Sequence, residues 1–116
     1  MVVRDRGEDT ETLVFHALAD PTRRDILQRA LRTGSSVSVL TQHYPMSFAA
    51  VQKHVAVLER AGLVSKQRQG REQIVHGNID TVRHAHRLLD RFEDLWRARI
   101  GRFGDALTTP NPGEPT

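Results

Sequence analysis

Apolar residues recur at steps of three and four in five stretches of this chain, the spacing that places side chains on one face of a helix. These stretches cover residues 11–19, 21–32, 37–44, 47–61 and 80–107. Between the last two lie two short runs with strand character, residues 63–68 and 71–76, and the Gln69-Gly70 step that joins them is typical of a hairpin tip. The pattern predicts a mainly α fold with one small β-hairpin, in the order α-α-α-α-β-β-α.

Helix-boundary residues support these limits. Asp20, Ser36 and Ser47 are predicted N-caps, because their side-chain oxygens accept hydrogen bonds from free amides of the first turn. Gly34 is a plausible left-handed cap for the second helix, and Pro45 ends the third. The third and fourth helices are then joined by a tight turn, which is helix-turn-helix geometry.

The fourth helix, residues 47–61, has two unlike faces. Its inward residues are Ala50, Val51, Val55, Leu58 and Ala61, and its outward residues are Phe48, Ala49, Gln52, Lys53 and Ala56. Small residues allow close approach to a groove floor, while Gln and Lys match base edges or phosphate and a Phe ring matches a thymine methyl group. Phe48 has the alternative of packing on the neighbouring helix. His54 lies between the faces, and both a structural role and a DNA contact stay open.

Positive charge gathers in the middle of the chain. The net charge is +3, but residues 21–73 hold nine Lys or Arg against three Asp or Glu, and a focused positive surface attracts polyanions. Thr22, Arg23 and Arg24 fall in the first turn of the second helix, where cations oppose the helix dipole. They are interpreted as phosphate contacts or as a solvated face that pairs with Asp20 or Asp25.

The predicted hairpin is basic near its tip. Lys66, Arg68 and Arg71 lie in or beside its two arms. Next to a helix-turn-helix pair, such a hairpin is a wing, here residues 66–73, whose arginines reach phosphates or the minor groove.

The last helix, predicted to begin at a cap on Asp80, has the most regular apolar stripe. This stripe is larger than so small a domain covers easily, which favours a subunit interface over packing within the chain. The predicted interface is Leu13, Val82, Ala85, Leu88, Leu89, Phe92, Leu95, Trp96, Ile100 and Phe103. Residues 1–10 are expected to be flexible and residues 108–116 disordered, so residues 11–107 form the predicted domain.

Composition excludes several kinds of chemistry. The chain has no cysteine, and therefore no disulfide, thiolate metal site or cysteine nucleophile. No apolar run approaches the roughly 18 residues of a membrane span, and residues 1–9 lack the core of a signal peptide, so we expect a cytoplasmic protein without a membrane partner. No phosphate-binding glycine loop, nucleophile elbow or plausible carboxylate pair is present, so no enzyme is expected.

Residues 14–107 resemble the ArsR family of bacterial winged-helix regulators. The resemblance is carried by Ala-Leu-Ala-Asp-Pro-Thr-Arg-Arg-Asp-Ile-Leu at 17–27, by Met46 to Val64, and by Arg-Gln-Gly-Arg-Glu at 68–72. It implies a homodimer joined by terminal helices, with each recognition helix in a major groove of double-stranded DNA and each wing on the flanking backbone, and usually repression of its own or neighbouring genes. The family's recognition positions fall here on Ser47, Phe48, Ala49, Gln52, Lys53 and His54, with Arg68 and Arg71 in the wing.

The chain departs from the family in the residues that sense metals. The helix before the recognition helix has no cysteine, and Asp80 is followed by Val82 where the family's second site has His. His84 and His86 stand four residues from Asp80 and Asp90, but they point nearly opposite ways on one helix and cannot share an ion without a partner subunit. We predict no cofactor and no metal site. A His/carboxylate metal-responsive repressor, a winged-helix protein-interaction module and a small-molecule effector remain alternatives.

Overall fold

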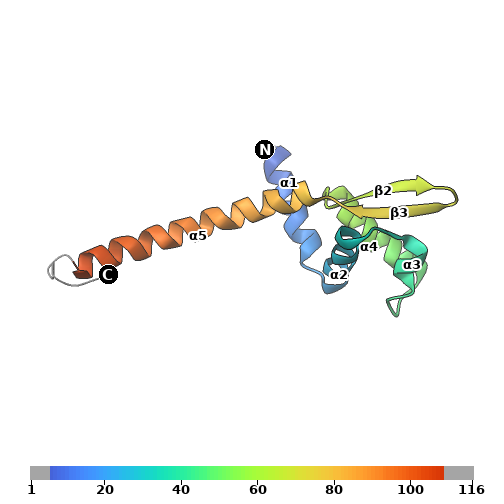
Figure 1. Ribbon diagram of the computed structural model, residues 1–116, viewed down its shortest axis with the longest axis horizontal. Coiled ribbons are helices and arrows are strands. Elements are labelled where there is room, and N and C mark those ends of the chain that lie inside the picture. Colours follow the sequence, from blue (N-terminus) through green and yellow to red (C-terminus); the bar gives the residue numbers. More distant parts are fainter. Residues whose placement is uncertain (1–5, 109–116) are drawn as a thin grey trace, which may run out of the picture. The chain divides into compact units, whose positions relative to one another are not determined.

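The computed structural model describes residues 6–108. Its elements are α1 Arg6–Leu18, α2 Pro21–Arg32, β1 Ser35–Ser36, α3 Val37–Thr41, α4 Phe48–Arg60, β2 Val64–Gln69, β3 Glu72–Gly77 and α5 Ile79–Thr108 (Figure 1). The described residues form two compact units, one that ends at Ala85 and one that begins at His86. The predicted fold class and element order are confirmed, with one short strand added.

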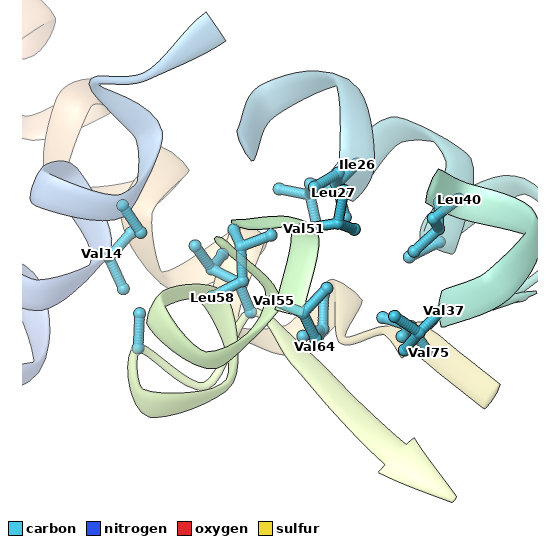
Figure 2. Packing of buried hydrophobic residues seen from close by; sticks show 14 of the residues in the cluster. Val14, Ile26, Leu27, Val37, Leu40, Val51, Val55, Leu58, Val64 and Val75 are labelled. Carbon is cyan, nitrogen blue, oxygen red and sulfur yellow. The ribbon is translucent and has the colours of Figure 1, made fainter. Parts of the chain in front are cut away.

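The core lies in the first unit, where α4 packs against α1, α2 and α3, and α2 packs against β3. Apolar side chains from all these helices meet there (Figure 2). Val51, Val55 and Leu58 supply the inner face of α4, as the three- and four-residue spacing predicts. The other buried apolar residues are Val14, Ala17, Ile26, Leu27, Ala30, Val37, Leu40, Ala61, Leu63, Val64, Val75 and Ala85.

Three of the four predicted N-caps are confirmed. The side chain of Asp20 accepts from the Arg23 amide at 3.0 Å, and those of Ser36 and Ser47 accept from the Val39 and Ala50 amides at 3.1 Å. Each bond satisfies a donor that the helix itself leaves free. The two helices of the helix-turn-helix therefore begin where the sequence places them.

The sheet has three antiparallel strands in the order β1-β3-β2. Gln69 pairs with Glu72, so the two-residue turn is Gly70-Arg71, one residue later than predicted. Gly70 has φ +60°, a value that glycine adopts without strain at the first central position of a hairpin turn. β1 was not predicted from the sequence, because two residues are too few to show an alternating pattern.

Several helix limits differ from the prediction. α1 begins at Arg6 rather than at residue 11, so residues 6–10 are helical and not flexible as predicted. α3 ends at Thr41, and Tyr44 lies in the turn that follows. Expectations about residues 1–5 and 109–116 lie outside the described residues.

The start of α5 is also different. The side-chain oxygen of Asn78 accepts from the Asp80 amide at 3.1 Å, so Asn78 is the cap and Asp80 is a first-turn residue. Asn78 and Thr81 each donate to the Gly62 carbonyl, at 3.0 and 2.7 Å. Asn78 is favoured as the cap because it serves both the helix and this neighbouring turn.

Leu31 follows Leu27 by four residues on the apolar side of α2, but it is 39% exposed. Gly77 explains the position, because a Cβ added there would lie 2.5 Å from the Leu31 side chain. Leu31 therefore covers the backbone of β3 at the edge of the core.

The second unit comprises α5 from His86 onwards. Six of its large apolar side chains are exposed, from 48% at Ile100 to 69% at Leu95. None of the helices within residues 6–108 is both long and apolar enough to cross a membrane.

Candidate nucleic-acid interface

The turn between α3 and α4 is held by a tyrosine. The Tyr44 hydroxyl donates to Oδ2 of Asp25 on α2 at 2.6 Å, and Arg29 Nε donates to the same oxygen at 2.9 Å. The Tyr44 and Arg29 hydrogen bonds lower the pKa of Asp25, and burial raises the pKa of Tyr44 to about 12. This network fixes the turn against α2 and thereby the position at which α4 begins.

α4 presents the predicted outward face. Ser47, Phe48, Ala49, Gln52, Lys53 and Ala56 are all exposed. Phe48 is 45% exposed, so it does not pack fully on the neighbouring helix. With Val51, Val55 and Leu58 anchored below, the helix holds a polar donor and acceptor, a cation and an aromatic ring on one surface beside small residues.

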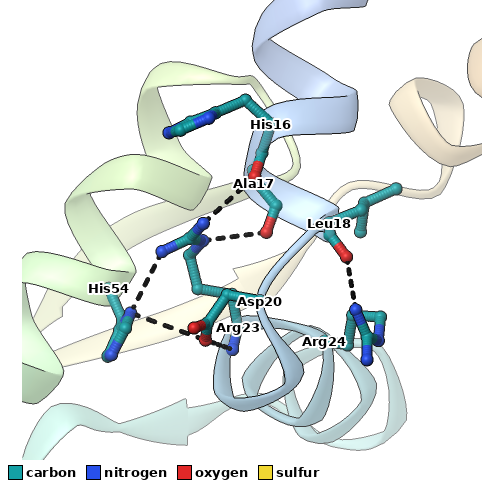
Figure 3. A network of polar contacts seen from close by, with 7 residues as sticks. All are labelled: His16, Ala17, Leu18, Asp20, Arg23, Arg24 and His54. Carbon is teal, nitrogen blue, oxygen red and sulfur yellow. Dashed lines mark hydrogen bonds and ion pairs between the residues drawn. The ribbon is translucent and has the colours of Figure 1, made fainter.

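The side chain of Arg23 forms hydrogen bonds within the fold. Its Nε donates to the Ala17 carbonyl at 2.8 Å and its Nη2 to the His16 carbonyl at 3.0 Å, at the C-terminal end of α1 (Figure 3). Its Nη1 lies 3.4 Å from Nδ1 of His54 on α4. The structure therefore gives Arg23 a role that neither sequence interpretation included, because the last carbonyls of α1 have no partner within their own helix.

Arg24 has a related but smaller role. Its Nη1 donates to the Leu18 carbonyl at 2.8 Å, and the residue is otherwise exposed. Thr22 is half-buried in the same turn. Neither Arg23 nor Arg24 bonds to the Asp25 carboxylate, which is used by Arg29 and Tyr44.

His54 is half-buried at the edge of the recognition face, as its boundary position predicted. Its Nδ1 lies 3.9 Å from Oδ2 of Asp20. The hydrogen bond from the Arg23 amide is the main cause that lowers the pKa of Asp20. The interface thus includes a polar cluster of Asp20, Arg23 and His54 behind the exposed face of α4.

The wing carries its cations in different settings. Lys66 Nζ lies 3.5 Å from Oε1 of Glu59 on α4, an ion pair that joins the wing to the recognition helix. Arg68 Nε donates to the Gly70 carbonyl at 3.3 Å across the tip. Arg71 is exposed in the turn itself, and its guanidinium is the wing cation best placed to meet a polyanion.

The residues that join one element to another were not predicted from the sequence. Asp25 and Arg29 are four residues apart, a spacing that signals an ion pair on one helix face. Their third partner is Tyr44, which lies in the turn after α3. No local signal marks Tyr44 or the Arg23–His54 contact, because each depends on a partner 19 or 31 residues away.

The predicted interface residues on α5 fall into two groups. Val82 is half-buried on the core and Ala85 is buried in it, and Leu13 of α1 also packs against this core. Leu88 is half-buried. Leu89, Phe92, Leu95, Trp96, Ile100 and Phe103 are exposed.

Histidine and carboxylate residues form pairs. His84 Nε2 lies 3.4 Å from Oε2 of Glu11 rather than beside Asp80, and His86 Nε2 lies 3.3 Å from Oδ2 of Asp90. Within residues 6–108, no group of three or more His, Cys, Asp or Glu side chains is arranged to hold a metal ion.

A helix-turn-helix with an exposed reading face, followed by a basic hairpin, defines a winged helix-turn-helix protein. The chain is similar to the solved structure of an ArsR-like transcriptional regulator from Rhodococcus sp. RHA1, at 30% identity and a TM-score of 0.73 over 90% of this chain and 94% of that one. It is also 33% identical to the HTH-type transcriptional regulator Rv2034 of Mycobacterium tuberculosis, over 67% of this chain and 73% of that protein. The chain belongs to the ArsR family of transcriptional regulators.

A third relative is the probable mercury resistance operon repressor of Streptomyces lividans. It is 38% identical over 64 residues, which are 55% of this chain and 51% of that protein. No protein-family model matches the chain.

Proposed function

We propose that this regulator is a homodimeric repressor that binds a palindromic operator through α4 and the β2–β3 wing. The observation that carries the proposal is the outward face of α4, on which Gln52, Lys53 and Phe48 are exposed while the opposite face is buried in the core. Gln recognises adenine through two hydrogen bonds, and Lys reaches guanine or phosphate. This function needs no catalytic step, and the protein would carry it out in the cytoplasm, where a bacterial chromosome lies.

Two copies are needed because one recognition helix reads only a short half-site. The exposed apolar side chains of α5 from Leu89 to Phe103 supply a surface for a second copy. An apolar surface of this kind is stabilised when a partner removes it from water. In this assignment Leu13, Val82 and Ala85 support the dimer from within their own subunit, because they pack against its core.

Wing cations contribute affinity rather than sequence reading. Arg71 is exposed at the tip and Arg68 lies beside it, which supports a contact of both with the DNA backbone or the minor groove. Lys66 is joined to Glu59, and its main role is to hold the wing on α4.

Selection of bound duplexes from a random pool tests this function. We expect one enriched palindromic sequence, bound by two copies of the chain, with an affinity that falls steeply as salt rises because each phosphate contact releases counterions. A scrambled duplex of equal length is the control. Equal binding of both duplexes, or binding insensitive to salt, would reject the proposal.

A protein-interaction module is the second candidate, and the exposed ring of Phe48 is the observation that favours it. It requires a stable complex with an acidic protein and no preferred duplex. Enrichment of a palindrome in the selection would decide against it.

A further inference from the structure

Three helices of the first unit meet at the side chain of Arg23. The residue lies in the first turn of α2, its guanidinium holds two carbonyls at the end of α1, and Nη1 faces His54 on α4 (Figure 3). α4 is the helix that carries the exposed reading face. Arg23 is therefore linked to that face although its own side chain is half-buried.

The two carbonyl bonds fix the direction of the third contact. A guanidinium is planar and its donors leave it in fixed directions. With Nε on the Ala17 carbonyl and Nη2 on the His16 carbonyl, at 2.8 and 3.0 Å, the plane is set by α1. Nη1 then lies 3.4 Å from the imidazole, so the end of α1 sets where the His54 ring rests.

This contact also decides where the imidazole carries its proton. Arginine only donates hydrogen bonds, so Nδ1 of His54 accepts, and the neutral ring then bears its proton on Nε2. Oδ2 of Asp20 lies 3.9 Å from Nδ1, beyond hydrogen-bond distance, and accepts from the Arg23 amide instead. His54 directly follows Lys53 in the recognition helix.

We propose that Arg23 is a positioning residue for DNA recognition, which joins the C-terminal carbonyls of α1 to His54 and so fixes the orientation of α4 and the Nε2–H form of the ring. The inference rests on the proposed function. This role differs from a direct phosphate contact, because Arg23 acts through His54 and its guanidinium N–H groups donate to atoms within the protein.

A double-mutant cycle on the full chain tests the coupling. Specific affinity is measured on the palindrome selected by the wild-type protein, with a scrambled duplex beside it, for Arg23→Gln, His54→Gln and the double variant. We expect each single change to lower specific affinity by about tenfold and the double change to lower it no further, since coupled residues are not additive. Affinity for the scrambled duplex and the dependence on salt should stay as in the wild type.

Arg23→Lys separates positioning from charge. Lysine keeps the positive charge, but one ammonium group does not reproduce the planar contact with two carbonyls and a ring. We expect the same loss as in Arg23→Gln. Wild-type affinity in Arg23→Lys would overturn the inference, and so would a fall of about one in the salt slope of Arg23→Gln, the sign of a lost phosphate contact.

Arg24→Gln is the matched comparison, because Arg24 also donates to a carbonyl of α1 but has no contact with His54 among those the structure shows. Its effect should add to that of His54→Gln. If the effects of Arg23→Gln and His54→Gln were also additive, the inference would be overturned. Unfolding of both Arg23 variants would overturn it too, because Arg23 would then be needed only for folding. If the wild-type protein prefers no palindrome, the proposed function fails and this inference with it; a preference combined with additive effects rejects the inference alone.

Discussion

Tyr44 shows how one side chain ties the reading helix to the rest of the domain. Its hydroxyl donates to Asp25 at 2.6 Å, and the Arg29 guanidinium lies 6.0 Å from its ring centroid. Burial removes the phenol from water and disfavours its charged form, which raises its pKa to about 12. A protonated tyrosine is thus part of the folded turn.

Because Tyr44 is the single tyrosine of the chain, its titration can be followed directly. Tyrosinate absorbance should rise with a midpoint near pH 12 in the folded protein and near about 10 in the unfolded one. The folded pKa lies above the unfolded value, so the stabilisation is complete below about pH 10 and is lost as the pH rises towards about 12. Tyr44→Phe should remove this alkaline dependence, and a midpoint near 10 in folded protein would contradict the buried contact.

Gln52 is a second single residue whose role can be tested. Its side chain is exposed and has no intramolecular hydrogen bond among those the structure shows. We expect Gln52→Ala to lose about 1–3 kcal/mol of discrimination at one base pair. Binding of the operator and its single-base variants measures this loss. Gln28→Ala, at an exposed residue of α2, is the control and should not change discrimination. Equal weakening on every duplex would show that Gln52 touches only the backbone.

Among the elements, local signals placed the starts of α2, α3 and α4 correctly, but not the start of α1 or the strand β1. Asp20, Ser36 and Ser47 cap the helices that the sequence predicted, because a cap bonds only three residues ahead. β1 was missed because it depends on β3, a segment distant in sequence. The cap of α5 was assigned to Asp80 rather than Asn78, although the Asn78 capping bond is itself local. The turn at Gly70 was displaced by one residue, which is within the usual error of a local pattern.

Gly77 tests the packing of α2 on β3. A Cβ at this position would lie 2.5 Å from Leu31 Cδ2 and 3.0 Å from Leu31 Cα, so Gly77→Ala forces the helix away from the strand. We expect a loss of about 1–3 kcal/mol in the free energy of unfolding, measured by urea denaturation. Gly101→Ala, whose Cβ would meet nothing within 4 Å, should leave the first unit unchanged. Wild-type stability in Gly77→Ala would show that α2 shifts without cost.

At the scale of the whole molecule, the exposed side chains of α5 set the expected assembly. Phe92 is 60% exposed and Trp96 56%, on a helix whose first two turns are already packed on the core. The apolar stripe could be predicted from the sequence, but which of its residues pack on the core and which stay exposed could not. Val82 and Ala85 share the stripe's spacing with Phe92, and only the packed structure shows which of them its own core covers.

Phe92→Asp should break the proposed dimer, because a carboxylate buried between apolar side chains lacks compensation. Sedimentation equilibrium should show a monomer, and operator affinity should fall towards that of a half-site. Arg87→Ala, an exposed polar change on the same helix, should keep the dimer. A Phe92→Asp protein that stays dimeric would place the interface elsewhere.

The sequence by itself determined the helices, the hairpin, the outward face of α4 and the family, because periodicity, caps and short motifs are local properties of the chain. Tertiary structure decided what the polar side chains do. Arg23 and Arg24 donate to carbonyls at the end of α1, Tyr44 donates to Asp25, and Lys66 forms an ion pair with Glu59. A charged or hydroxyl group takes the partner that folding brings within about 3 Å, and that partner is set by packing between distant segments rather than by spacing along the chain.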